Sequence, residues 1–408
     1  MKMTKLNIAD KSLIRQINTS AILQVIREKE PISRAEISKL TGLNPATVSN
    51  NVSNLIQMKI VREIGSGESS GGRKPVLLEL NPKAFYIIGV DMGTTKVITA
   101  VTDIEGKIVK KVVMRFPKDR TVKVVIDIIK DSIYKVIEDS NVEVDKILGI
   151  GMGVHGLVDC DKGISIYAPA FDWHNIDIKK IFEDEFSVPV NIDNDARVMA
   201  LGEKWFGRAK NASDFVCLNI GTAIGSGIYL NGELYRGSSF GAGEIGHINI
   251  VNRGPRCNCG NYGCLEVMAS GPAIVDRFIE RINCGEKSKV IDFVDGNLSD
   301  ITGEIIFKAA IEGDELSKTI LNETGRYIGL AVSVIINLLN PEMILIGGGV
   351  SKAGEFIFDA IKDTVFQKSM KHNVENTYIG PTGLGEDCGV IGAATLILKD
   401  IFKAPKLY

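Results

Sequence analysis

The sequence lacks any long apolar run, and this absence excludes several classes of protein. No stretch of the 408 residues approaches the roughly 18 consecutive apolar residues that a membrane-spanning helix requires. The N-terminus also lacks the apolar segment of a secretory signal peptide. The chain has seven cysteines, an odd number that argues against a framework of disulfides. We therefore expect a cytoplasmic protein that has no contact with a membrane.

The charge is small overall but unevenly distributed. The chain carries a net charge of −2, yet residues 1–82 contain 12 Lys and Arg against 7 Asp and Glu, which gives +5 there and leaves −7 for the remainder. With 45% hydrophobic and 24% charged residues, the chain can build two or three packed lobes. A basic N-terminal segment on an acidic body suits a small module that meets phosphate groups.

The first eighty residues follow the pattern of a helix-turn-helix. Apolar residues recur at helical spacing between Lys11 and Glu30, which predicts one helix or a pair of short ones. Ser33 and Glu36 have the spacing of a capping box at the start of a second helix. After a tight turn, Asn44 is placed to cap a third helix with Pro45 at its first position.

The third predicted helix carries short, uncharged polar side chains on the face opposite its apolar residues. That face comprises Thr47, Ser49, Asn50, Asn51, Ser53 and Asn54. Asparagine can bond adenine at two positions in the major groove, and serine and threonine can donate or accept there. The alternative is the solvated face of an ordinary helical hairpin, but such faces usually carry Lys and Glu. The pattern therefore favours a helix that reads DNA.

Two short β segments, residues 60–64 and 76–80, flank a glycine-rich loop. The loop ends in Gly-Gly-Arg-Lys-Pro, which can place Arg73 in a narrow, A·T-rich minor groove. This pattern predicts the wing of a winged helix-turn-helix domain over residues 1–82, and a flexible linker is the alternative. The residues expected to contact DNA are Asn44, Thr47, Ser49, Asn50, Asn51, Arg73 and Lys74.

A pattern of strand, glycine-rich loop and strand occurs twice in the body of the chain, at residues 91–96 and 221–227. Glycine lets backbone amides approach phosphate oxygens, threonine hydroxyls can donate, and Asp91 can hold a metal-bound water. Either loop alone could be a tight hairpin turn, but two in register suggest an internal duplication. The expected nucleotide-binding residues, for ATP with Mg²⁺, are Asp91, Gly93, Thr94, Thr95, Gly221, Thr222 and Gly348.

A third predicted strand, residues 188–192, leads into Asp193, Asn194 and Asp195. The carboxyl ends of strands in α/β sheets are where such folds bind ligands. Asp195 could accept a proton from a sugar hydroxyl as a general base, or it could cap the helix that follows.

Four residues form a pattern typical of a metal site. They are His247, Cys257, Cys259 and Cys264, with the spacing H-x9-C-x-C-x4-C. These ligands satisfy tetrahedral zinc and leave no position open, so the zinc is predicted to be structural, whereas reduced cysteines without a metal are the alternative. Glu244 and Glu266 flank the cluster, and rigid carboxylates of this kind recognise polyols.

With these residues assembled, the chain resembles the ROK family of repressors, open-reading-frame proteins and sugar kinases. Within it, the chain resembles the winged-helix repressor branch, and its head and wing resemble those of xylose-operon repressors. The resemblance covers nearly the whole length. It rests on SSGGRKP (69–75), DMGTTK (91–96), GVHGLVD (153–159), NDA (194–196), GEIGH (243–247) and CNCGNYGCLE (257–266).

This resemblance implies an α/β fold in which the winged head precedes a two-lobed, actin-like ATPase body of the sugar-kinase type. We place the first lobe at residues 83–200, completed by 385–408, and the second lobe with the zinc loop at 201–384. The resemblance implies a sugar between the lobes, contacted by residues matching Asn194, Asp195, Glu244, His247 and Glu266. Asp195 would be the catalytic base in a kinase.

Two functions remain open. The favoured one is a repressor without physiologically important kinase activity, which binds operator DNA as a homodimer or a dimer of dimers. A monosaccharide, with xylose or glucose favoured, would release it by closing the lobes and changing the spacing of the heads, about 34 Å for one helical turn. The alternative is an ATP-dependent sugar kinase with an added DNA-binding head.

Overall fold

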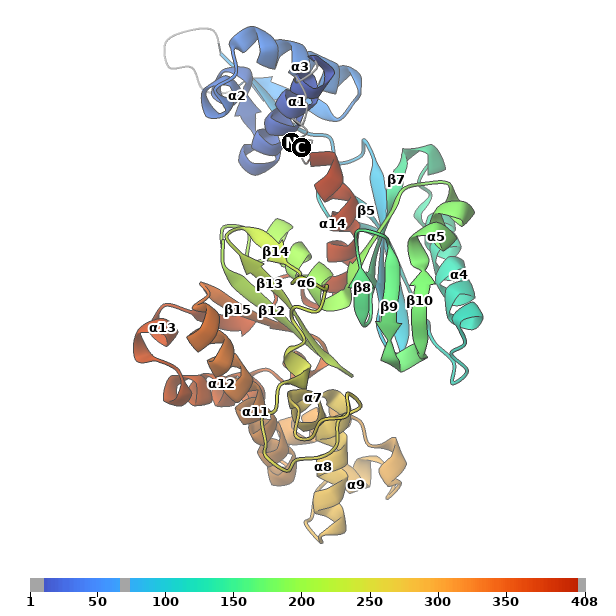
Figure 1. The fold of residues 1–408 in the computed structure, drawn as a ribbon, viewed down its shortest axis with the longest axis vertical. Coiled ribbons are helices and arrows are strands. Elements are labelled where there is room, and N and C mark those ends of the chain that lie inside the picture. The colour runs from blue at the N-terminus through green and yellow to red at the C-terminus, as the bar shows by residue number, and fades with distance from the viewer. Residues whose placement is uncertain (1–10, 67–73, 403–408) are drawn as a thin grey trace, which may run out of the picture.

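The computed structural model describes residues 11–66 and 74–402, which form a small N-terminal head and two α/β lobes (Figure 1). The head contains α1 (Lys11–Lys29), β1 (Ile32–Ser33), α2 (Arg34–Thr41), α3 (Pro45–Gln57), β2 (Val61–Ser66) and β3 (Val76–Leu80). Its three strands form an antiparallel sheet in the order β1-β3-β2. Within the described ranges, no helix combines the length and the apolar character needed to span a bilayer.

The predicted helix boundaries of the head are confirmed. Ser33 and Glu36 form a capping box at the start of α2, and the Asn44 side chain accepts the backbone N–H of Thr47 at the start of α3. The segment from Lys11 is a single helix rather than a pair. The predicted wing loop, including Arg73, lies outside the described residues.

The first lobe is built on a five-stranded sheet of order β11-β7-β4-β5-β6. Its strands are β4 (Tyr86–Met92), β5 (Lys96–Asp103), β6 (Ile108–Arg115), β7 (Ile147–Val154) and β11 (Val190–Asn194). The helices packed on it are α4 (Val122–Ser140), α5 (Ile178–Phe186) and α14 (Cys388–Phe402). A small sheet of β8 (Leu157–Asp159), β9 (Ile164–Ala168) and β10 (Trp173–Asp177) lies at one side.

The second lobe repeats this topology. Its strands are β12 (Phe215–Ile220), β13 (Ile224–Leu230), β14 (Glu233–Tyr235), β15 (Met343–Gly347) and β16 (Tyr378–Pro381). In both lobes the first three strands form antiparallel neighbours, and the fourth and fifth strands add in parallel on the other side of the first. The internal duplication suggested by the two glycine loops is therefore present in the strand order.

The helices of the second lobe pack around its sheet and form the larger of the two lobe cores. They are α7 (Leu265–Ala269), α8 (Gly271–Asn283), α9 (Val290–Phe293), α10 (Gly303–Ile311), α11 (Glu315–Leu339), α12 (Glu355–Lys368) and α13 (Lys371–Glu375). Between the two lobes runs α6 (Asp195–Trp205), which contacts β12 and β13 of the second lobe and α14 of the first (Figure 1).

Helix α14 covers the face of the first sheet opposite α4 and α5, and its end reaches the head (Figure 1). Successive residues of a strand face opposite sides, so glycines on one side of β4 and β7 leave room for a helix there. A Cβ on Gly89 would lie 2.1 Å from the carbonyl oxygen of Val390, and one on Gly151 would lie 1.8 Å from that of Ala393. These glycines let α14 approach the backbone of the sheet.

Candidate functional site

The head presents part of the predicted polar face of α3 to solvent. Ser49 and Asn50 are exposed and Thr47 is half-buried, while Lys74 lies exposed just before β3. Asn44 is also exposed, and its Oδ1 accepts the N–H of Thr47 at 2.7 Å, so part of its side chain is used as a helix cap. On α3 itself, the exposed Ser49 and Asn50 and the half-buried Thr47 are polar and uncharged.

Asn51 is the exception, and we remove it from the predicted DNA contacts. Its side chain is 7% exposed. Its Nδ2 donates to the carbonyl of Thr47 at 2.8 Å, and its Oδ1 accepts from the Thr19 hydroxyl of α1 at 2.8 Å. The amide is therefore used to join α3 to α1, because a buried polar group needs partners inside the protein.

The carboxylates of the first lobe lie where β11 meets α6. Asn194 caps α6 by accepting the N–H groups of Ala196 and Arg197, and its Nδ2 donates to the carbonyl of Gly156 at 2.9 Å. Asp195 is the first residue of α6, so the prediction that it might act as the cap is off by one residue. Its carboxylate is 17% exposed and lies 3.9 Å from Nδ1 of His155.

Electrostatic interactions link this carboxylate to its neighbours. Burial alone would lower the pKa of His155, but the nearby carboxylate of Asp195, with further negative charge from Glu266 and Glu244, raises it. Burial raises the pKa of Asp91 to about 7, and the charge of Asp195 contributes to this rise. Carboxylates of both lobes therefore lie close enough to His155 to influence its pKa.

The second lobe places two further carboxylates beside that group. Glu266, in α7, accepts the backbone N–H of Ile224 at 3.0 Å, which ties it to the start of β13. Glu244 lies in the loop after β14, and its Oε2 is 3.9 Å from Nε2 of His247. The sugar-contact residues predicted from the sequence are thus brought to the facing sides of the lobes.

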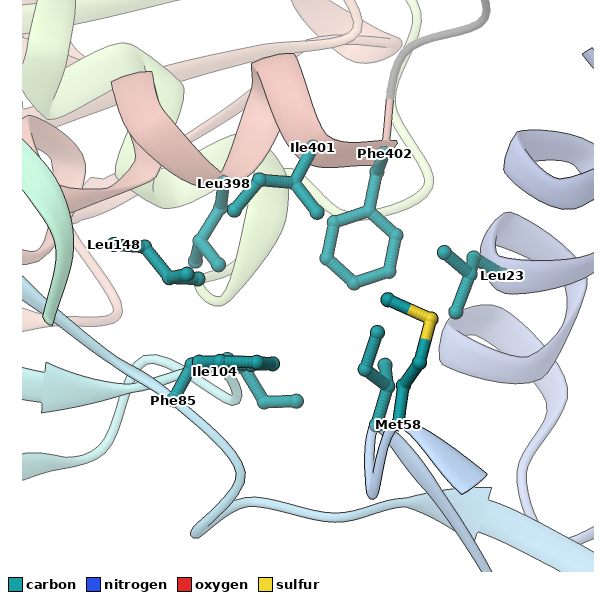
Figure 2. Close-up of a pocket in the computed structure, with 9 residues that line it drawn as sticks. Leu23, Met58, Phe85, Ile104, Leu148, Leu398, Ile401 and Phe402 are labelled. Carbon is teal, nitrogen blue, oxygen red and sulfur yellow. The ribbon is translucent and has the colours of Figure 1, made fainter. Parts of the chain in front are cut away.

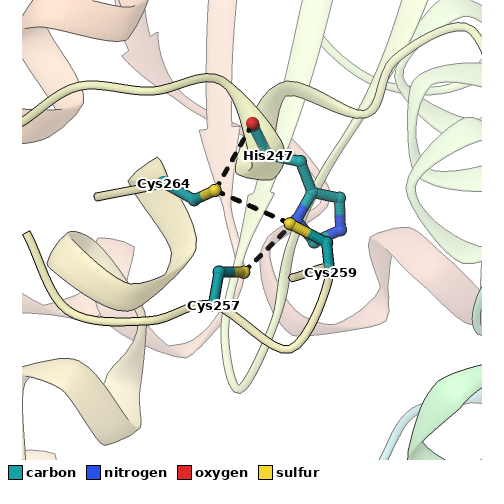
Figure 3. A group of neighbouring side chains, drawn as sticks. All are labelled: His247, Cys257, Cys259 and Cys264. Carbon is teal, nitrogen blue, oxygen red and sulfur yellow. Dashed lines mark hydrogen bonds between the residues drawn. The ribbon is translucent and has the colours of Figure 1, made fainter. Parts of the chain in front are cut away.

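The predicted metal ligands converge at one point (Figure 3). The ligand atoms of His247, Cys257, Cys259 and Cys264 all lie within 4.8 Å of one another. Nδ1 of His247 lies 3.6 Å from Sγ of Cys257, and Sγ of Cys259 lies 3.7 Å from that of Cys264. Tetrahedral zinc with bonds of about 2.3 Å separates its ligand atoms by roughly 3.7 Å, so these residues fit the ion. His247 directs Nδ1 to the cluster and Nε2 to Glu244.

Comparisons with known proteins agree with this architecture. A model of the ROK family matches residues 87–400, and a model of winged helix-turn-helix DNA-binding domains matches residues 15–62. The chain belongs to the ROK family.

Two of the relatives compared with this ROK protein span its head and its body, and a third matches 76% of its length. A xylose repressor of Caldicellulosiruptor bescii is 34% identical over 399 residues, covering 97% of this chain and 98% of the relative. The structure of a ROK family transcriptional regulator, a homologue of the E. coli MLC protein, shares 30% identity with a TM-score of 0.83, covering 96% of this chain and 97% of that one. A ROK family glucokinase from Streptomyces griseus, in complex with glucose and AMPPNP, shares 32% identity with a TM-score of 0.70, covering 76% of this chain and 98% of that one.

The predicted nucleotide-binding residues of this ROK protein lie at the ends of β4 and β12, which are the first strands of the two lobes, and of β15. Asp91 is in β4 and is followed by the loop Gly93–Thr95, while Gly221 and Thr222 follow β12, and Gly348 follows β15. The second glycine-rich loop is shorter than expected, because β13 begins at Ile224. A Cβ on Gly389 of α14 would lie 2.3 Å from Oδ2 of Asp91, so α14 closes over this carboxylate.

Sequence reasoning missed a buried ionic group that joins the lobes of the ROK body. Asp193 is fully buried and pairs with Arg197 of α6 at 3.2 Å and with Arg236 of the second lobe at 2.7 Å. The spacing of Asp193 and Arg197, four residues apart, could have suggested the first pair. No local signal points to Arg236, because it is 43 residues away in sequence.

Proposed function

We propose that this protein is a sugar-responsive transcriptional repressor that binds operator DNA as a homodimer and is released by a monosaccharide. The observation that carries the proposal is the exposed, uncharged polar face of α3 on a head that is fused to a ROK body. Thr47, Ser49 and Asn50 can contact base edges, while Lys74 and, from the sequence prediction, Arg73 would contact the phosphate backbone or the minor groove. The relative named xylose repressor supports xylose as the first sugar to test.

We propose that the sugar binds between the lobes, with Asn194 and Asp195 on one side and Glu244, His247 and Glu266 on the other. Zinc on His247, Cys257, Cys259 and Cys264 would fix the loop that carries these groups, and its closed ligand set gives it a structural role. His247 would then bind zinc through Nδ1 and offer Nε2 to a sugar hydroxyl, because a metal-bound imidazole keeps its second nitrogen available. The lobes 83–200 with 385–408, and 201–384, remain our proposed division of the body.

A direct test measures operator binding with and without sugar. Full-length protein is titrated into a fluorescent duplex from the region upstream of its own gene, with D-xylose, D-glucose or neither, and anisotropy reports the affinity. We expect one sugar to weaken binding at least tenfold, while L-xylose, the enantiomer, has no effect. Binding that no sugar changes would overturn the proposal.

A second function, sugar phosphorylation, is favoured by one observation. Asp91 lies near the end of β4 and Asp195 directly follows β11, two strands of the same sheet separated by β7, and burial together with the charge of Asp195 raises the pKa of Asp91 to about 7. A divalent cation such as Mg²⁺ compensates carboxylates in this situation, and Gly93, Thr94 and Thr95 follow with the amides and hydroxyls that phosphate groups require. Asp195 would accept the proton of the sugar hydroxyl.

Kinase activity is tested by a coupled assay with ATP, Mg²⁺ and D-glucose or D-xylose. Turnover of roughly 1 to 1,000 per second lies in the ordinary enzymatic range and would establish the kinase function. The Asp195→Asn variant provides the background rate, since an amide cannot accept the proton. Equal rates for the two proteins would exclude catalysis at this site.

A further inference from the structure

Helix α6 connects the two sites proposed above. We propose that α6 transmits sugar binding to the DNA-binding head: its first turn belongs to the sugar site, and Trp205 at its last position holds Arg27 of α1. This inference rests on the proposed repressor function and adds the physical route by which the sugar acts.

The first turn of α6 is tied to the loop that carries Glu244. Arg197 is 1% exposed, and its guanidinium donates to the carbonyls of Phe240 and Ala242 in that loop, the latter at 3.2 Å. Asp195, at the start of the same turn, faces the site from the first lobe. A sugar that engages Asp195 and Glu244 together therefore acts on the beginning of α6 from both lobes.

The middle of α6 is packed closely on two sides. A Cβ on Gly227 of β13 would lie 2.5 Å from Cβ of Ala200, and a Cβ on Gly392 of α14 would lie 1.8 Å from the carbonyl oxygen of Val198. Backbone therefore meets backbone or small side chains on both sides, and close-packed elements of this kind transmit displacement rather than absorb it. The 11 residues of α6 span about 16 Å.

The last residue of α6 meets the head. The guanidinium carbon of Arg27 lies 3.8 Å from the centroid of the Trp205 ring and 5.6 Å from that of Phe402 of α14. Within the described structure, the buried Nη1 of Arg27 has no hydrogen-bond acceptor. The ring faces are therefore the main partners of this guanidinium, apart from Glu28 at 3.4 Å, and the contact is sensitive to where the indole lies.

Packing between the head and the body is incomplete, which leaves room for the head to shift at this joint. An apolar pocket of about 200 Å³ lies between the head and the body, and Figure 2 shows the residues that line it. Leu23 and Met58 of the head face Leu398 and Phe402 of α14 across it. The contact between the head and the body is thus less closely packed than the contacts that α6 makes with β13 and α14.

The experiment compares Arg27→Met with Lys29→Met in the full-length protein. Methionine keeps an apolar stem of similar length at position 27 but removes the charge that the ring attracts, while Lys29→Met removes one charge from an exposed position of the same helix. For each protein we measure the affinity for D-xylose by calorimetry and the ratio of operator affinities without and with saturating D-xylose. If D-glucose proves to be the effector of the wild type, it replaces D-xylose throughout.

We expect Arg27→Met to bind the sugar with an affinity within about twofold of that of the wild type. Its ratio of operator affinities without and with sugar should be at least about fivefold smaller than that of the wild type, since allosteric couplings commonly change affinity by about 5- to 150-fold. Lys29→Met should keep the ratio. If Arg27→Met keeps the wild-type ratio of operator affinities, the proposed role of α6 is wrong, but the repressor function is unaffected. If sugar does not change the operator affinity of the wild type, both proposals are wrong.

A second measurement covers the case in which Arg27→Met fails to fold. The chain contains two tryptophans, and the other, Trp173, is buried in the first lobe. In the Trp173→Phe variant, fluorescence therefore reports on Trp205 alone. The sugar should shift the emission of Trp205, although this residue lies at the far end of α6 from the sugar site. Unchanged emission at saturating sugar overturns the proposal.

Discussion

At the scale of single residues, Asp91 gives the protein a stability that depends on pH. Burial raises the pKa of this carboxyl from 3.8 to about 7, and the charge of Asp195 adds to the rise. The folded protein therefore keeps a proton that the unfolded chain releases above about pH 4. Stability falls with pH wherever the folded state binds more protons, so Asp91 lowers the free energy of unfolding between about pH 4 and pH 7.

The Asp91→Asn variant should lose this dependence. Relative to the wild type, its free energy of unfolding should rise by nearly 3 kcal/mol, on the order of two pKa units, between pH 5 and pH 8, because each pKa unit corresponds to about 1.4 kcal/mol. Urea denaturation of both proteins at the two pH values measures the difference. Parallel pH profiles would show that Asp91 is ionised in the folded protein.

A second prediction at the scale of single residues concerns the proposed zinc ligands. Cys259→Ser removes one of four converging ligands, and zinc affinity should fall by at least about 100-fold, since loss of a mere supporting group costs 10- to 100-fold. The sugar response should be lost with the metal, because the loop carrying Glu244 and His247 is no longer fixed. Atomic absorption and sugar calorimetry provide the readouts. Cys284→Ser, at an exposed cysteine outside the cluster, is the matched control. If zinc-free Cys259→Ser still binds the sugar, zinc is not needed to hold the sugar-binding residues of this loop in place.

Residues that are close in sequence were predictable, and residues joined over long distances were not. The metal ligands span 18 residues of one loop, so their spacing alone indicated the cluster. Asn51 was misplaced because its polarity suggested exposure, whereas its partner Thr19 lies 32 residues away. The same limit applies to the pair of Asp193 and Arg236, which only the folded sheets bring together.

At the scale of elements, α3 can be tested as a reading helix. Asn50→Ala should weaken binding to the specific operator by about 5- to 150-fold, the cost of one good pair of bonds to a base, and leave non-specific binding unchanged. Lys74→Ala should weaken binding to all sequences alike and reduce the salt dependence by about one counterion. Anisotropy titrations at several salt concentrations distinguish the two. Equal loss of specific and non-specific affinity in Asn50→Ala would contradict the reading role.

The second glycine-rich segment shows why element boundaries were harder to predict. Gly225 and Gly227 look like loop residues in the sequence, but they lie in β13. Their glycine character serves packing instead, because α6 lies against this strand and a Cβ at either position would contact Ala196 or Ala200. Composition alone does not distinguish a glycine needed for a turn from one needed for close approach.

At the scale of the whole molecule, the duplicated lobes are joined by α6 and by a buried ionic group. Asp193 belongs to the first sheet, and Arg236 follows β14 of the second, so their 2.7 Å contact crosses between the lobes. A buried carboxylate with fewer partners is unfavourable, and breaking such a pair typically costs 3–5 kcal/mol. The group therefore stabilises one arrangement of the lobes and holds the loop that leads to Glu244.

The Arg236→Gln variant tests this joint. We expect its free energy of unfolding to fall by about 3 kcal/mol, because Asp193 then keeps Arg197 as its remaining cationic partner among the contacts described, and we expect sugar affinity to fall with it. Urea denaturation and sugar calorimetry measure the two effects, with Arg326→Gln on the exposed side of α11 as the control. Lost stability with unchanged sugar affinity would mean that the lobes are held together here but that the position of Glu244 is set elsewhere. Unchanged stability would mean that solvent or Arg197 alone satisfies Asp193, and the two lobes would then depend on α6 for their connection.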